Sequence, residues 1–138
     1  MVQGKWFFYT EQLDDVKTVL HSVYGSEPEL TDDDFYGFNI VVYDGNEPVC
    51  CGRLNHKDDK FIIGRLCTSP QKRGNGFADL ALRMLIRKAF DMGAENVSAY
   101  AGEKEANYFL RIGFKMMERT ENGWLLTKFE DVGGCCKK

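Results

Sequence analysis

The chain has little of what marks a membrane, secreted or nucleic-acid-binding protein. None of its apolar runs approaches the roughly 18 residues that span a bilayer. The first ten residues, MVQGKWFFYT, lack the basic and apolar regions of a signal peptide. The net charge is only −3, so there is no overall positive surface for nucleic acid. We therefore expect a cytoplasmic protein whose partners include neither a membrane nor nucleic acid.

Histidine is scarce, and the cysteines lack the spacing of a metal site. Zinc ligands usually include C-x2-C pairs, and the chain has none of these beside its two histidines. An odd number of cysteines, five, with two adjacent pairs also argues against a disulfide framework. We predict no metal, and we expect the cysteines in apolar runs to be buried as small hydrophobic residues. These are Cys50, Cys51 and Cys67.

The 138 residues contain no internal repeat, low-complexity block or Pro/Ser-rich linker, which predicts a single domain. We place this domain over residues 1–130. Residues 131–138 combine Gly-Gly, a cysteine pair and two lysines, so we expect a flexible C-terminal tail. Nothing in the sequence distinguishes a monomer from a homodimer.

Hydrophobic periodicity predicts alternating strands and helices in the first half of the chain. Residues 4–9 read as an aromatic-rich strand. Thr10 is a plausible N-cap for a helix whose apolar residues recur until Gly25. The acidic segment 26–37 is expected to be irregular, with room for one helical turn. Turn signals then separate three strands, which should form an antiparallel meander. These strands cover residues 38–45, 47–56 and 60–68.

The helix predicted over residues 77–92 is the clearest element of the second half. Its polar residues form one narrow stripe, so most of its girth should lie against a sheet. The strand at 96–101 is expected to return parallel to the third strand of the meander. A short helix over 102–112 and a hairpin of strands at 114–120 and 124–130 follow. This order predicts an α/β fold with a mixed sheet of about seven strands.

Two glycines stand directly before the long helix, in the run S-P-Q-K-R-G-N-G-F-A. Glycine weakens a helix start unless the backbone must adopt an unusual conformation or approach something closely. The first helical turn has unpaired N–H groups and partial positive charge, and Lys72 and Arg73 add formal charge. We predict a phosphate-type anion site, and the alternative is a plain turn before the helix.

Two familiar phosphate motifs do not fit this loop. A P-loop requires G-x-x-x-x-G-K-[ST], and Gly74 is not followed by that arrangement. A dinucleotide fingerprint requires glycine or alanine where Asp79 stands, and an antiparallel meander disagrees with a doubly wound fold. A generic phosphate or nucleotide binder remains as a weaker interpretation.

A third motif fits. Residues 71–76, Q-K-R-G-N-G, match Q/R-x-x-G-x-G/A, and the run L-C-T-S-P-Q-K-R-G-N-G-F-A resembles the coenzyme A pyrophosphate loop of the GNAT superfamily of acyl-CoA N-acyltransferases. Residues 108–114, Y-F-L-R-I-G-F, resemble the family's second motif, F-Y-x-x-x-G-F. The resemblance covers residues 4–130 in element order, and the specific motifs cover 66–78 and 106–114. It implies a mostly antiparallel sheet with helices on both faces and a central splayed parallel strand pair.

The resemblance also implies transfer of an acyl group, usually acetyl, from acyl-CoA to an amine by direct attack. Acetyl-CoA is then a co-substrate, and the acceptor amine is left open. The backbone amide of Cys67 would polarise the thioester carbonyl. A nucleophilic Cys67 thiol is the less favoured alternative, because nothing nearby in sequence offers a base. The residues expected to bind CoA are Leu66, Cys67, Thr68, Gln71, Lys72, Arg73, Gly74, Asn75, Gly76, Phe77, Ala78 and Asn107.

The acid and the base are harder to place. In the family, a tyrosine four residues before the motif glycine often protonates the leaving thiolate, and Phe109 stands there. Tyr108 is adjacent, and general acid and packing residue are both open for it. Many members carry a carboxylate on the strand corresponding to 60–68, and this strand has none. A water chain is one substitute. The candidate side chains, each of which is otherwise a surface charge, are His56, Asp58, Asp59 and Glu103.

Two further hypotheses follow. The phenylalanine at the acid position and the missing strand carboxylate keep open a non-catalytic module that binds or senses acyl-CoA. Residues 27–34 carry five carboxylates, which would attract a cationic amine to the acceptor side. A polyamine, a lysine side chain or an aminoglycoside would fit. The alternative is a solvated acidic loop.

Overall fold

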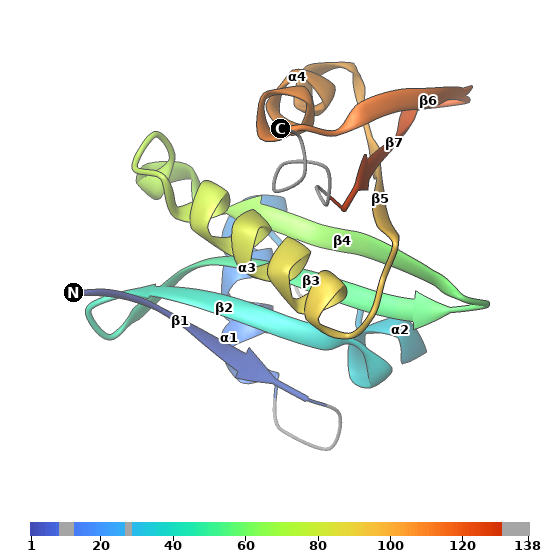
Figure 1. The fold of residues 1–138 in the computed structure, drawn as a ribbon. Helices are drawn as coiled ribbons and strands as arrows, with labels where there is room; N and C mark the ends of the chain where they lie inside the picture. Colours follow the sequence, from blue (N-terminus) through green and yellow to red (C-terminus); the bar gives the residue numbers. More distant parts are fainter. Residues whose placement is uncertain (9–12, 27–28, 131–138) are drawn as a thin grey trace.

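The computed structural model describes residues 1–8, 13–26 and 29–130, and its elements follow the predicted order (Figure 1). One short helix lies within the acidic segment, and one 3-10 turn, Pro70–Lys72, precedes the glycines. The elements are β1 (Val2–Phe7), α1 (Asp14–Tyr24), α2 (Asp32–Tyr36), β2 (Phe38–Asp44), β3 (Glu47–Lys57), β4 (Lys60–Thr68), α3 (Phe77–Asp91), β5 (Asn96–Ala101), α4 (Glu103–Ile112), β6 (Lys115–Thr120) and β7 (Gly123–Phe129).

The strands form one mixed sheet in the order β1-β2-β3-β4-β5-β7-β6. Neighbouring strands are antiparallel except β4 and β5, which are parallel. This pair is held only at Ile62↔Ser98 and Ile63↔Ala99, after which the two strands diverge (Figure 1). The predicted mixed, mostly antiparallel sheet with a central splayed pair is therefore confirmed.

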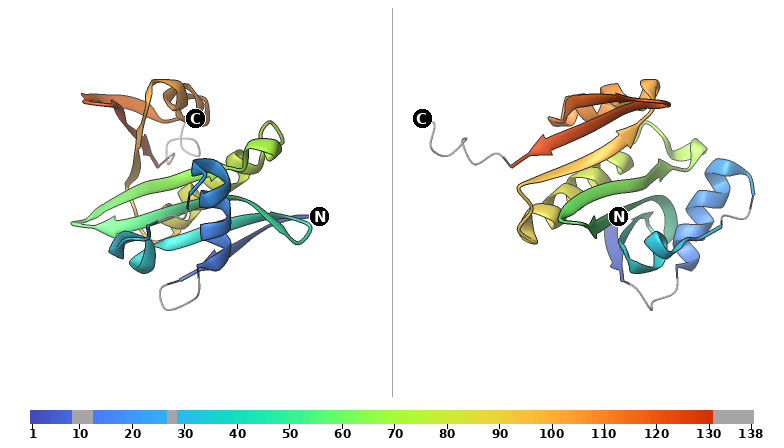
Figure 2. Two further views of the ribbon diagram at one scale, coloured as in Figure 1. Left: turned by 180° about the vertical axis from the view of Figure 1, so that it is seen from behind. Right: turned by 90° about the vertical axis from the view of Figure 1, so that its right-hand side faces the viewer.

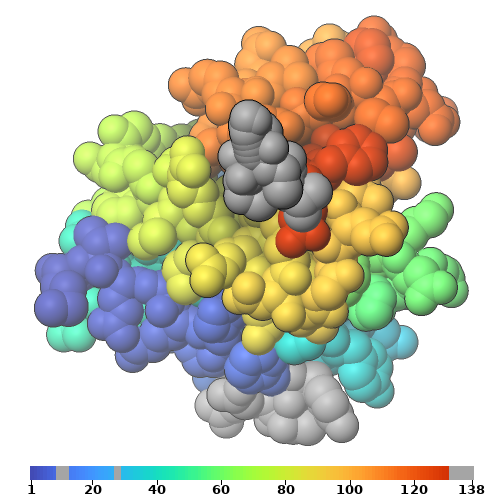
Figure 3. All heavy atoms as spheres, viewed as in Figure 1, coloured from blue at the N-terminus to red at the C-terminus, as the bar shows by residue number. Residues whose placement is uncertain are grey.

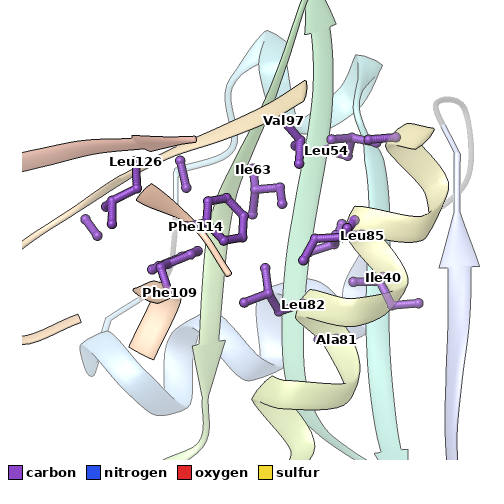
Figure 4. Packing of buried hydrophobic residues seen from close by; sticks show 14 of the residues in the cluster. Ile40, Leu54, Ile63, Ala81, Leu82, Leu85, Val97, Phe109, Phe114 and Leu126 are labelled. Carbon is purple, nitrogen blue, oxygen red and sulfur yellow. The ribbon is translucent and has the colours of Figure 1, made fainter. Parts of the chain in front are cut away.

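Helices cover both faces of the sheet, as predicted (Figure 2). Helix α3 packs on one face, where Leu82 and Leu85 meet Ile40, Leu54 and Ile63 in the larger core (Figure 4). In the space-filling view, α3 lies between the N-terminal strands and the block formed by α4, β6 and β7 (Figure 3). The narrow polar stripe of α3 fits this position, because the rest of its circumference is packed.

Helix α1 packs on the opposite face and makes the second core. Val19 and Leu20 are fully buried there against Val41 and Cys51. Successive residues of a strand point to opposite faces, so Cys50 lies in the core under α3 instead. The expected burial of these two thiols is confirmed, whereas Cys67 is only half-buried.

A β-bulge interrupts β4 where it begins to leave β5. Cys51 pairs with Cys67 and Arg53 pairs with Gly64, so β4 has one more residue than β3 between these pairs. Arg65, within the bulge, has φ +57, which is uncommon for a residue other than glycine. A bulge bends its strand, and here the bend carries the end of β4 away from β5.

The buried carboxylate of Asp34 ties this bulge to α2. It accepts hydrogen bonds from Arg53 Nη1 at 2.6 Å and from Arg65 Nε and Nη2 at 3.0 and 2.9 Å. It also closes a capping box with Thr31 at the start of α2. Burial alone would raise the pKa of Asp34, but the hydrogen bonds from Arg65, the Thr31 amide and Arg53 outweigh it and lower the pKa to about 2.

Some expectations fall outside the described residues, namely the Thr10 N-cap and the tail at 131–138. Helix α1 begins at Asp14, and Leu13 stands at its N-cap. Among the described residues, no helix is both long and apolar enough to cross a membrane. The same residues contain no cluster of three or more His, Cys, Asp or Glu side chains that could hold a metal ion.

We predict that Asp34→Asn lowers the free energy of unfolding by about 3 kcal/mol, because two guanidinium groups lose their anion in a largely buried place. A lowered carboxyl pKa stabilises the fold above the unfolded value of 3.8, and this stabilisation is lost as the pH falls from about 4 to about 2. Urea unfolding at several pH values should therefore show a shallower acid dependence in the variant.

Asp33→Asn is the matched control, because Asp33 makes an exposed ion pair with Lys57 at 2.9 Å. It should leave the free energy of unfolding nearly unchanged. Equal destabilisation by the two substitutions would show that the Asp34 network does not hold the bulge.

Candidate functional site

A cleft of about 1080 Å³ opens between the diverging ends of β4 and β5. Its walls come from the end of α1, the second half of β4, the loop that follows, the start of α3, the end of β5 and the inner side of α4. Most of the predicted binding residues lie here. They are Leu66, Cys67, Thr68, Lys72, Arg73, Gly74, Gly76, Phe77 and Ala78, with Tyr108 opposite.

Beyond Ile63, the edge of β4 that faces β5 pairs with no strand among the described residues. The amide of Ser69 donates to the carbonyl of Val49 and so points toward β3. Backbone groups two residues apart on a strand point the same way, so the amide of Cys67 also faces β3. The backbone groups of Leu66 and Thr68 then face the cleft. The Thr68 carbonyl accepts a hydrogen bond from Arg73 of the loop at 3.1 Å, which agrees with this direction.

The glycine loop has the unusual backbone that its sequence predicts. Gly74 and Gly76 both have φ +83, and Gly76 is the N-cap of α3. Apart from the glycine itself and its chain neighbours, no atom of the described residues lies within 4 Å of where a Cβ would stand on Gly74 or Gly76. The Asn75 side-chain amide donates to the carbonyls of Lys72 at 3.0 Å and Arg73 at 3.4 Å, which fixes the turn from within. The start of α3 therefore faces open space, as an anion site requires.

The two basic residues of the loop are held differently. The guanidinium of Arg73 is tied to the end of β4. Lys72 instead directs its ammonium to Glu47 at 3.4 Å and Asp44 at 3.6 Å, and the hydrogen bond to Glu47 is the main cause of its raised pKa. The charge of Lys72 is thus shared with the β2–β3 turn, which the sequence did not indicate.

Tyr108 stands in the opposite wall with a fully buried hydroxyl that has no hydrogen-bond partner among the described residues. Burial is the main cause that raises its pKa, to about 12, so the phenol is protonated at neutral pH. Arg111 lies over its ring at 5.6 Å. An unsatisfied buried hydroxyl is costly, and such groups in native structures need an explanation.

Phe109, at the family's usual tyrosine position, belongs to the core instead. Its ring packs edge-on against Phe114 at 5.2 Å between centroids (Figure 4). Phe109 also lines the cleft, and adjacent helical residues point about 100° apart, so Tyr108 and Phe109 meet the cleft from different directions.

Four further residues that sequence reasoning missed also line the cleft. Tyr24 comes from α1, Arg65 from the bulge, Tyr100 from β5 and Glu105 from the first turn of α4. Burial, followed by the nearby Cys67 thiol, raises the pKa of Tyr24. Each of these residues is unremarkable in its own segment, and only the folded sheet brings them together.

The four candidate bases lie elsewhere among the described residues. The ring of His56 stacks on Phe61 at 4.0 Å, and Asp58 and Asp59 form the tight turn between β3 and β4. Glu103 pairs with Arg119 at 3.0 Å.

None of these four bases lines the cleft, and neither do three of the predicted CoA-binding residues. These three are Gln71, Asn75 and Asn107.

The acidic segment is also less available than its composition indicates. Asp34 is fully buried between two arginines, and Asp33 pairs with Lys57. Glu27 lies outside the described residues. The structure therefore uses two of the three consecutive aspartates to hold β3 and β4, which removes support for a dense anionic patch that attracts a cation.

Comparison with known proteins places this chain in a family. The model of the acetyltransferase (GNAT) family matches residues 6–114. The chain is 27% identical over 117 residues to the "Uncharacterized N-acetyltransferase YjcF" of Bacillus subtilis (strain 168), across 80% of this chain and 84% of that protein.

Two crystal structures share the fold at low sequence identity. An acyl-CoA N-acyltransferase from Pseudomonas aeruginosa superposes with a TM-score of 0.80 and 14% identity, over 93% of this chain and 99% of that one. A GNAT family acetyltransferase from Elizabethkingia anophelis with acetyl-CoA bound gives 0.77 and 16% identity, over 94% and 98%. Because the family model matches most of its length, the chain belongs to the GNAT family of acetyltransferases.

Proposed function

We propose that the protein is an N-acetyltransferase that transfers the acetyl group of acetyl-CoA to a primary amine by direct attack. The observation that carries this proposal is one cleft that joins an open anion-binding helix start to an unpaired strand edge. Coenzyme A needs both, because it carries a pyrophosphate and an extended arm with amide groups.

The pyrophosphate would bind at the start of α3. Gly74 and Gly76 leave room for its oxygens, and the amides of Phe77 and Ala78 are among those without a partner inside the helix. Arg73, held at the end of β4, adds a formal positive charge on the same side. The pantetheine arm would then pair with the free edge of β4 as an added strand does.

The thioester carbonyl would be polarised by a backbone amide of β4. The alternation of the strand favours the amide of Leu66, because that of Cys67 faces β3. A fixed amide aimed at the carbonyl oxygen stabilises the charge that develops when the amine attacks. The role expected for the Cys67 amide, which is to polarise the thioester carbonyl, is therefore assigned to the amide of Leu66.

Proton transfer completes the step. The protonated hydroxyl of Tyr108 would donate to the departing CoA thiolate, which gives its unpaired buried oxygen a partner. Glu105 lines the cleft, as Tyr24 and Tyr100 do, and we assign it to accept the proton of the amine, directly or through water. The products are the amide and free CoA thiol, and the proton taken up by Glu105 returns to Tyr108 through solvent, which restores both side chains.

The proposal is tested by measuring thiol release with acetyl-CoA and a panel of cationic, neutral and anionic amines, with mass detection of the products. We expect amine-dependent release and one acetylated amine class. CoA binding without release for any amine would instead support the acyl-CoA-binding module.

Gly76→Asp should reduce CoA affinity at least about tenfold, because it places a carboxylate in the phosphate cradle, and aspartate tolerates the left-handed backbone. Gly93→Asp is the matched control. Gly93 also has positive φ and open space around it, but it follows the other end of α3. Calorimetry showing equal affinities for both variants would contradict the loop assignment.

Tyr108→Phe should lower kcat at least about tenfold with little change in CoA affinity. Its thermal stability should be unchanged or higher, because the substitution removes an unsatisfied buried hydroxyl. Tyr43→Phe should lower the thermal stability and leave kcat unchanged, because the Tyr43 hydroxyl donates a hydrogen bond to Asp15 outside the cleft. Unchanged turnover in the Tyr108 variant would make that residue a packing residue.

A further inference from the structure

Two thiols face each other across β3 and β4 just beyond the bulge. Cys51 and Cys67 are directly opposed in the antiparallel register, and their Sγ atoms are 3.8 Å apart. Both side chains point to the α1 face of the sheet, where they pack in the same core. Directly opposed antiparallel residues have Cα atoms about 4.5–5.5 Å apart, which lies within the range that a disulfide bridges.

The two thiols differ in their access to the cleft. Cys51 is fully buried, and its thiol lies 3.5 Å from the Arg65 carbonyl in the bulge. Cys67 is half-buried and lines the cleft on the side of Tyr24. A reagent that enters the cleft therefore meets Cys67 first, and Cys51 lies directly behind it.

Their electrostatic surroundings reinforce this difference. The hydrogen bond from Cys51, and then the positive charges of Arg65 and Arg73, lower the pKa of Cys67. The same hydrogen bond and its own burial raise the pKa of Cys51. The half-buried Cys67 is thus the more acidic thiol of the pair, and Cys51 holds its proton more tightly. The thiolate is the form that attacks disulfides, so Cys67 is the better placed of the two to attack first.

We propose that Cys51 and Cys67 are a dithiol couple that a small disulfide entering the cleft oxidises to an intramolecular disulfide. The thiolate of Cys67 attacks one sulfur of RS–SR, which expels RS⁻ and leaves a mixed disulfide on Cys67. Cys51 then loses its proton to the released thiolate and attacks the Cys67 sulfur, which expels the second RS⁻. Two protein thiols are oxidised, and one small disulfide is reduced to two thiols.

This chemistry is separate from the proposed acyl transfer, because neither sulfur carries an acyl group. The bond would join β3 to β4 one pair away from the bulge that opens the cleft. The oxidation state of the couple would therefore be set by the small thiols and disulfides that reach the site.

Cys50 provides an internal control. It is adjacent to Cys51 in sequence, but its side chain lies on the α3 face in the larger core. Burial is the main cause that raises its pKa, to about 11. If the cysteines reacted only according to accessibility or general reactivity, Cys50 and Cys51 would behave alike. The geometry of the pair instead predicts that Cys51 bonds to Cys67 and that Cys50 does not.

The test uses the full chain with Cys135→Ser and Cys136→Ser, treated with 2-hydroxyethyl disulfide and followed by intact mass and peptide mapping. This reagent is small and uncharged, so its reaction does not depend on CoA binding. We expect the loss of two hydrogen atoms, a peptide link between Cys51 and Cys67, and full reversal by dithiothreitol. Cys50→Ser in the same background should behave identically.

Two variants separate the roles of the pair. Cys51→Ala should accumulate one stable adduct on Cys67, and Cys67→Ser should react at least about tenfold more slowly. A stable adduct on Cys67 while Cys51 is present would overturn the proposal, as would no slowing in Cys67→Ser. The peptide map of the protein with only Cys135→Ser and Cys136→Ser needs neither variant. It shows whether Cys51 and Cys67 form a disulfide even where a variant does not fold.

Discussion

The pairing of one buried carboxylate with two arginines positions the rest of the site. Asp34 holds Arg65 in a backbone conformation that a non-glycine residue rarely adopts, and Arg53 on β3 anchors the same carboxylate from the neighbouring strand. The bulge fixed in this way bends β4 away from β5, so that the sheet opens instead of continuing its ladder. The same carboxylate caps α2, so the fold and the cleft share one anchor.

The parts of the site that are local in sequence could be predicted. The glycine loop is one, because the need for positive φ at Gly74 and Gly76 is visible as glycine beside a helix start. The strand order is another, since alternating patterns and turn signals delimit each element. The sequence left open whether Tyr108 is a general acid or a packing residue, because Phe109 stands at the family's usual tyrosine position. The structure places Phe109 in the core, and the role of Tyr108 stays a prediction.

The parts that depend on distant contacts could not be predicted. Tyr24, Tyr100 and Glu105 come from three elements, and no spacing in the sequence relates them. The acidic segment was interpreted as a possible anionic patch because composition does not show that the Asp34 carboxylate is paired with arginines on β3 and β4. Likewise, strand alternation relative to β3, not the residue type, turns the Cys67 amide away from the cleft.

The most direct test of this account is an amide NMR titration of the protein with CoA. We expect the largest shifts at Leu66, Thr68 and residues 73–78, where the bulge frees the edge of β4 and the helix start faces the cleft. We expect little change in the β6–β7 hairpin. Shifts confined to that hairpin or to the β3–β4 turn, with the strand edge and the loop unaffected, would contradict it.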